Sequence, residues 1–82
     1  MHITVHFYGV LRHIVGADHR TIDVVSAPED VGQLRALLGS TLPAIAPTLG
    51  ATAVVVGDEV VPDSTPLTLP IEVALLPPVS GG

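Results

Sequence analysis

The sequence contains no cysteine, no lysine and no tryptophan, and its only Phe and Tyr are Phe7 and Tyr8. Without cysteine the chain can form no disulfide and offers no thiolate nucleophile. Any sulfur chemistry must therefore use a group other than a side chain. Without lysine, copies of the chain cannot be linked to one another through ε-amines. Because 48% of the residues are nevertheless hydrophobic, the core has to be built mainly from Val, Leu, Ile and Ala.

Positive charge is also scarce, because three arginines stand against eight acidic residues and the net charge is −5. The basic stripe that neutralises nucleic-acid phosphates is missing, so we expect no nucleic-acid partner. The first ten residues lack the basic start of a signal peptide, and no apolar run approaches the ~18–20 residues of a membrane span. We therefore expect a single-domain cytoplasmic protein that does not bind a membrane.

The hydrophobic pattern predicts an α+β domain over residues 1–76. Polar and apolar residues alternate over 2–7, so Ile3, Val5 and Phe7 are expected to point inward and Tyr8 outward. The next strand would pair with this one in an antiparallel hairpin. Strands are predicted at 2–7, 21–25, 52–56, 59–61 and 71–76, and short helical turns at 9–15 and near 44–49.

The main helix is expected to begin after Asp30, because Asp30 and Gln33 fit a capping box, and to end at Gly39. Its apolar stripe would consist of Val31, Leu34, Leu37 and Leu38. One such helix packed across a mixed sheet of four or five strands accounts for the order of the elements.

The last six residues differ in character from the rest: Pro77, Pro78, Val79, Ser80, Gly81 and Gly82. The prolines favour an extended exit from the last strand, and two glycines can enter a channel too narrow for other residues. Six residues at about 3.3 Å each reach roughly 20 Å. We therefore predict a flexible C-terminal tail over 77–82 that carries the Gly82 carboxylate into the active site of another protein. The alternative is a frayed end or the remnant of an expression tag.

The chain resembles the ubiquitin-like sulfur carriers from end to end, and among them the small subunits of molybdopterin synthase. The resemblance rests on Phe-Tyr-Gly-Val-Leu-Arg at 7–12, on Val-Gly-Gln-Leu-Arg at 31–35, and above all on the Pro-Pro-Val-Ser-Gly-Gly ending at 77–82. A terminal Gly-Gly alone is a weak signal because all ubiquitin-like modifiers share it. The proline-rich ending is more specific to the molybdopterin branch.

This resemblance implies a ubiquitin-like β-grasp fold and a carrier that is not itself an enzyme. An activating enzyme would use ATP to adenylate Gly82, next to Gly81, and a sulfur donor would convert the adenylate into a thiocarboxylate. The tail would then enter the large catalytic subunit of a heterotetrameric synthase, where the sulfur passes to a pterin precursor. No cofactor would be bound by the chain itself. The residues expected to contact these partners are Tyr8, Arg12, Val60, Leu76, Pro77, Pro78, Val79 and Ser80.

Three other functions fit the sequence less closely. The first is a carrier for thiazole or cysteine synthesis, the second a ubiquitin-like modifier of target lysines, and the third an interaction module with an inert tail. A metal site is not expected, because His2 and His6 lie about 13 Å apart in a strand and cannot share one ion.

Overall fold

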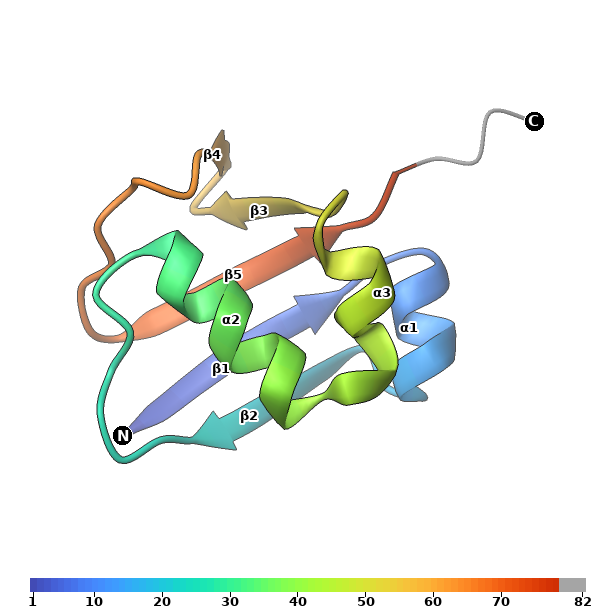
Figure 1. The fold of residues 1–82 in the computed structure, drawn as a ribbon, viewed down its shortest axis with the longest axis horizontal. Coiled ribbons are helices and arrows are strands. Elements are labelled where there is room, and N and C mark those ends of the chain that lie inside the picture. The colour runs from blue at the N-terminus through green and yellow to red at the C-terminus, as the bar shows by residue number, and fades with distance from the viewer. Residues whose placement is uncertain (79–82) are drawn as a thin grey trace.

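A computed structural model describes residues 1–78 of the chain (Figure 1). Its five strands form one mixed sheet in the order β2-β1-β5-β3-β4, so the last strand lies in the centre. The strands are β1 (His2–Phe7), β2 (His19–Asp23), β3 (Ala53–Val56), β4 (Glu59–Val61) and β5 (Ile71–Leu76). The helices are α1 (Val10–Val15), α2 (Val31–Thr41), the 3-10 turn η1 (Pro43–Ile45) and α3 (Ala46–Leu49).

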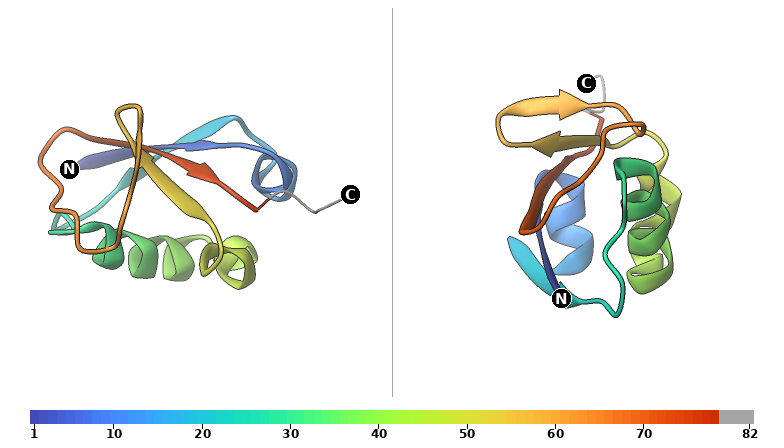
Figure 2. Two further views of the ribbon diagram at one scale, coloured as in Figure 1. Left: turned by 90° about the horizontal axis from the view of Figure 1, so that it is seen from above. Right: turned by 90° about the vertical axis from the view of Figure 1, so that its left-hand side faces the viewer.

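One face of the sheet is covered by α2 and α3, and the described residues place no helix over the opposite face (Figure 2). The covered face forms the core, because alternate residues of each strand point toward the helices. From the strands these are Ile3, Val5, Phe7, Ile22, Val54, Ile71, Val73 and Leu75; the helical elements add Leu11, Val31, Leu34, Leu38, Ile45 and Leu49. The expected inward residues of the first and last strands are thus confirmed, as is the β-grasp arrangement.

The middle of the sheet is the parallel pair β1 and β5, in which Phe7 lies opposite Leu75. On the far side of β5, Leu76 lies opposite Ala53 of the antiparallel β3. The end of β5 is therefore tied to both neighbouring strands, and the chain leaves the sheet from its centre.

The second strand begins and ends two residues earlier than expected. It covers His19–Asp23 rather than 21–25, because its antiparallel pairing follows β1, with His6 opposite His19 and His2 opposite Asp23. The ladder ends where β1 begins, and Val25 lies almost fully exposed beyond it. The third strand also differs from the prediction, because it begins at Ala53 rather than at residue 52.

The prediction that the main helix ends at Gly39 was wrong, since α2 continues to Thr41. Gly39 lies inside the helix where it faces α3, and a Cβ there would lie 3.7 Å from Leu49. The helix ends instead before Pro43, because a proline disfavours helical geometry at the preceding residue. Leu42 accordingly has φ −125° and ψ 72°.

The expected capping of α2 is present in a slightly different form. The Asp30 side chain accepts a hydrogen bond from the Gln33 N–H at 2.8 Å. The Gln33 side chain reaches back to the N–H of Glu29 at 2.9 Å, rather than to that of Asp30 itself. The first bond satisfies a backbone donor that the first turn of the helix leaves unpaired, and the second holds the residue before the N-cap.

Arg35 on α2 connects three separate segments of the chain. Its guanidinium donates to the carbonyl oxygens of Leu49 and Thr52 and forms an ion pair with Asp63 at 2.9 Å. The sequence places Arg35 in the helix but gave no sign of this role. No helix among residues 1–78 is long and apolar enough to cross a membrane.

Candidate functional site

The predicted reactive end of the chain follows the central strand. β5 ends at Leu76, and the structure describes the chain as far as Pro78. The four predicted site residues Val79, Ser80, Gly81 and Gly82 lie outside the described residues. The geometry of the site is therefore that of the exit from the sheet and of the surface around it.

At this exit Pro77 lies against the turn between β1 and α1. Gly9 in that turn has φ +56° and ψ −135°, which disfavours any residue with a side chain. A Cβ built on Gly9 would lie 3.1 Å from Cγ of Pro77. The β1–α1 turn and the start of the tail are thus in close contact although they are separated by almost the whole sequence.

Three of the predicted contact residues lie on the uncovered face of the sheet. Tyr8, Val60 and Leu76 are exposed by 43%, 65% and 38%, respectively. Tyr8 and Leu76 follow the paired residues Phe7 and Leu75, so they lie at the same end of neighbouring strands. We call Tyr8, Val60 and Leu76 the outer patch.

Smaller apolar side chains connect the members of the outer patch. Val55 lies opposite Val60 on one side and opposite Ala74 on the other. Val55 and Ala74, together with Tyr8, line a shallow hollow of about 310 Å³ in this face. An apolar surface therefore extends across three strands and borders the tail exit.

A polar rim lies next to the outer patch. His6 Nε2 and Glu72 Oε2 are 2.6 Å apart across the β1–β5 pair, and both residues line the same hollow. The ring of His19 on β2 lies 5.8 Å from that of His6, centroid to centroid. Strand alternation placed His6 and Glu72 on the outer face, but the proximity of His6 and His19 depends on the register of β2, which the sequence did not reveal.

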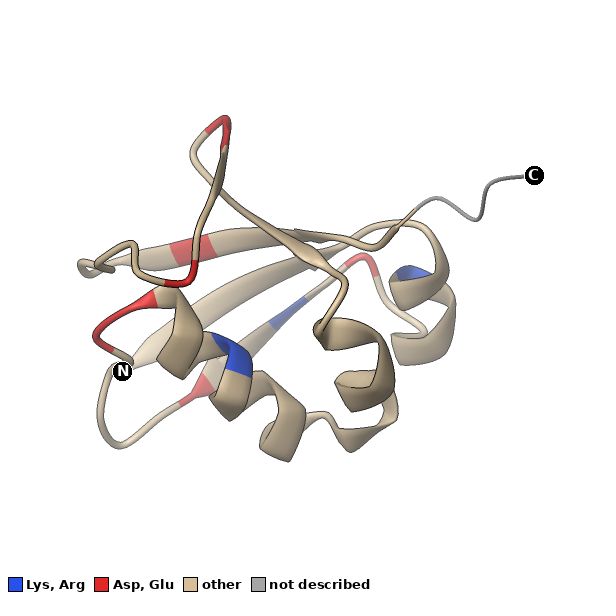
Figure 3. Cartoon of the chain, turned by 45° about the horizontal axis from the view of Figure 1, so that its top comes forward, with Lys and Arg blue, Asp and Glu red and all other residues tan. Residues whose placement is uncertain are grey.

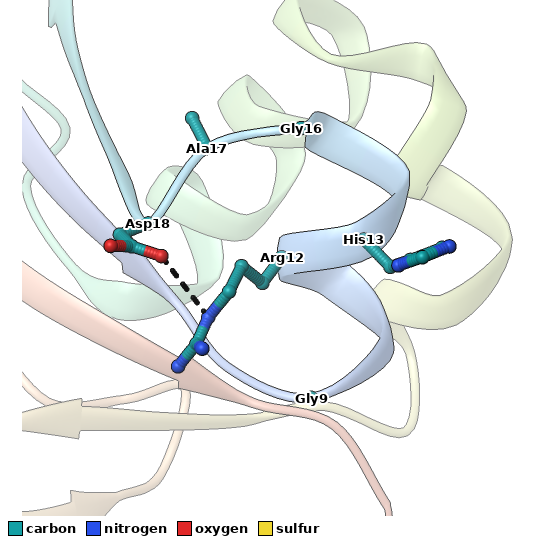
Figure 4. Close-up of a pocket in the computed structure, with 6 residues that line it drawn as sticks. All are labelled: Gly9, Arg12, His13, Gly16, Ala17 and Asp18. Carbon is teal, nitrogen blue, oxygen red and sulfur yellow. Dashed lines mark ion pairs between the residues drawn. The ribbon is translucent and has the colours of Figure 1, made fainter.

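Arg12 lies on α1 beside the tail exit. Its Nε is 3.3 Å from an Asp18 carboxylate oxygen, and its guanidinium carbon lies 6.0 Å from the centre of the Tyr8 ring. Figure 4 shows the ion pair at the side of an open recess of about 590 Å³ formed by α1 and the following turn. The Arg12 side chain is half exposed.

The acidic residues are distributed unevenly. Figure 3 shows most of them at the end of the molecule away from α1, around the β3–β4 turn and the start of α2. These positions correspond to Asp58 and Glu59 in the first group and to Glu29, Asp30 and Asp63 in the second. Charge near the outer patch comes from Glu72 on β5 and from Arg12 beside the Tyr8 ring.

Among residues 1–78, no group of three or more His, Cys, Asp or Glu side chains is arranged to hold a metal ion. The part of the chain that the structure describes also leaves no buried side-chain donor or acceptor without a partner. Of the site predicted from the sequence, the structure brings together the exit, the outer patch and Arg12.

A protein-family model with the description ThiS family matches residues 5–82, which is nearly the whole chain. The chain belongs to the ThiS family. This confirms the group expected from the sequence, that of the ubiquitin-like sulfur carriers. A search of curated proteins finds no match.

Solved structures extend the comparison of this ThiS-family chain. Small archaeal modifier protein 1 from Haloferax volcanii matches in two crystal structures, with TM-scores of 0.79 and 0.75 and sequence identities of 22% and 20%. The first match covers 100% of both chains and the second covers 95% of this chain and 98% of that one. These similarities confirm the fold.

A further match is a chain of the complex between subunits 1 and 2 of molybdopterin-converting factor from Helicobacter pylori. Its TM-score is 0.66, its identity is 29%, and the match covers 100% of both chains.

Proposed function

We propose that the chain is the sulfur-carrying small subunit of a molybdopterin synthase. The observation that carries this proposal is the full-length similarity, at 29% identity, to a chain of the molybdopterin-converting factor complex. The Pro-Pro-Val-Ser-Gly-Gly ending at 77–82 supports the same branch of the family. In this role the chain supplies no catalytic group of its own, and the reactions take place in the active sites of its partners.

The chemistry uses the main-chain carboxylate of Gly82. A carboxylate is a poor electrophile, so an activating enzyme first transfers AMP from ATP to it and releases pyrophosphate. Sulfide from a sulfur donor then attacks the acyl carbon and expels AMP, which leaves a thiocarboxylate. Because the chain contains no cysteine, no side-chain thiol competes for the activated carbonyl.

The folded domain contributes docking rather than catalysis. The outer patch offers apolar area next to the exit, and the charged residues at its border, Arg12 and Glu72, provide orientation. Binding through this face would place the tail at the entrance of a partner's active site. The reaction then gains from proximity only while the two proteins are docked.

The proposal is tested by reconstitution with the activating enzyme and the large subunit from the same organism. With ATP, sulfide and the pterin precursor, we expect the full-length chain to support dithiolene formation. A variant without Gly82 should support none, although its thermal unfolding should be unchanged because the core lies within residues 1–76. A Val25→Ala variant, which is changed at an exposed loop site remote from β5, is prepared and assayed in the same way as the control. Normal product formation without Gly82 would refute the proposal.

Membership of the ThiS family also supports a sulfur carrier for a different product, such as a thiazole. The partner distinguishes the two functions. Affinity capture from the source cells should retain a pterin-converting large subunit if the first proposal is correct. Capture of a thiazole-forming enzyme instead would favour the second. Conjugates to lysines of other proteins would indicate a modifier.

A further inference from the structure

The contact between Gly9 and Pro77 is the point at which the departing chain lies against the domain. A Cβ on Gly9 would lie 3.1 Å from Cγ and 3.8 Å from Cδ of the Pro77 ring. Carbon atoms in favourable contact are about 3.5–4.0 Å apart, so the first of these distances is too short. A side chain at residue 9 would therefore crowd the ring, which would have to shift by a few tenths of an ångström.

The other glycines with positive φ do not share this property. Gly16 has φ +79° and Gly57 has φ +63°, and a Cβ on either would meet no described atom within 4 Å. Those two positions favour glycine for backbone reasons alone. Position 9 favours glycine because of its backbone angles and, independently, because a Cβ there would lie too close to the Pro77 ring.

A shift of the Pro77 ring also shifts the main chain that follows β5. The ring fixes φ near −65°, so the ring cannot move away without moving the main chain. The preceding residue, Leu76, is held by pairing with Ala53 of β3. With a strand ladder before it and the Gly9 turn beside it, Pro77 has little freedom in its placement.

We propose that Gly9 is a positioning residue, which sets the direction in which the C-terminal segment leaves the sheet by leaving room for the Pro77 ring. A side chain at residue 9 would displace Pro77 and so change the direction in which the chain leaves β5. This inference rests on the proposed function for its biological meaning. The contact itself is a property of the isolated protein.

The functional consequence follows from the demands of group transfer. A reacting group misplaced by about 1 Å can lose as much as 100-fold in rate, even when the change lies far from the chemistry. A displaced exit would impair adenylation of Gly82 while the outer patch still docks. The effect should therefore fall on kcat for activation rather than on KM.

The first test uses the isolated protein and its NMR spectrum. We expect a nuclear Overhauser effect between the Gly9 Hα protons and the Pro77 ring protons of the full-length wild-type chain. Absence of this effect, with the rest of the β1–β5 pairing intact, would overturn the proposal. This test needs no partner, so it stands even if the proposed pathway is wrong.

The second test is a double-mutant cycle of Gly9→Ala and Pro77→Ala, measured as activation by the activating enzyme and ATP. We expect Gly9→Ala to lower kcat by roughly tenfold or more with KM within about twofold. In the Pro77→Ala background, where the ring is absent, the same change should cost less than about threefold. Equal losses in both backgrounds would mean that Gly9 acts through backbone strain, and would overturn the proposal.

Gly16→Ala is the control for a side chain at a left-handed glycine that meets no neighbour, since Gly16 has φ +79° and ψ 22°. We expect its kcat to remain within about twofold of wild type. A loss as large as that of Gly9→Ala would count against positioning. Failure of the wild-type chain to be activated at all would refute the proposed function instead, and the NMR result would still decide the role of Gly9.

Discussion

The two faces of the sheet are built from alternate residues of the same strands, yet they differ in every other respect. On the inner face Leu75 is fully buried against the helices, whereas on the outer face its neighbour Leu76 is 38% exposed. The inner face is closed by α2 and α3, and the outer face remains uncovered over the described residues (Figure 2). We therefore expect stability to depend on Leu75 and partner binding on Leu76, so that single substitutions should separate the two.

This separation is tested most directly by comparing the stabilities of Leu75→Ala and Leu76→Ala, because the two variants carry the same change at neighbouring residues. Leu75→Ala should lower the free energy of unfolding by about 2–5 kcal/mol, because it removes buried area and leaves a cavity. Leu76→Ala should cost less than about 1 kcal/mol. Thermal unfolding followed by circular dichroism measures both, and similar losses for the two variants would contradict the assignment of the faces.

On the inner side of the molecule, Arg35→Ala should lower the free energy of unfolding by about 1.5–3 kcal/mol. The change removes an ion pair with Asp63 and a donor to the carbonyl oxygens of Leu49 and Thr52, of which Leu49 keeps the Thr52 N–H as a second donor. Urea unfolding provides the measurement. Arg20→Ala is the control, since Arg20 is exposed on the edge strand β2, and an equal loss there would show that Arg35 has no special role.

On the outer side, Leu76→Asp should weaken binding to the large subunit by roughly tenfold or more, since a charge would enter an apolar interface. The melting temperature should fall by only a few degrees, because the side chain is not part of the core. Isothermal titration calorimetry and a thermal scan on the same sample give the two values. Normal affinity with a large loss of melting temperature would place Leu76 in the core instead.

The smallest effect is expected for Val60→Ala at the edge of the outer patch. Val60 is 65% exposed and lies on the short edge strand β4. We expect binding to weaken by about threefold and stability to change by less than about 0.5 kcal/mol. A change in stability above 1 kcal/mol would show that β4 depends on this side chain.

The sequence was sufficient to predict the faces of β1 and β5, because strict alternation of polar and apolar residues assigns a side to each position. It also predicted β4 and the start of α2, where turn and capping residues leave few alternatives. The end of α2 was missed because Gly39 is a common helix terminator, whereas here Pro43 limits the helix, which continues to Thr41. The limits of β2 were missed because strand pairing with β1, rather than local composition, decides them.

For the candidate site, the exposure of Tyr8, Val60 and Leu76 was predictable from alternation and from resemblance. The contact between Gly9 and Pro77 was not, because it joins segments 68 residues apart and depends on the parallel pairing of β1 with β5. The roles of Gly81 and Gly82, which lie outside the described residues, stay predictions.

The central claim is that sulfur is loaded onto the main-chain carboxylate at residue 82. Intact-mass measurement of the chain isolated from its own cells under non-reducing, mildly acidic conditions tests this most directly. We expect a species heavier than the calculated mass by about 16 Da, with the increase located at the C-terminal residue by fragmentation, as replacement of one oxygen by sulfur requires. An end that stays an ordinary carboxylate in cells actively making the cofactor would contradict the account.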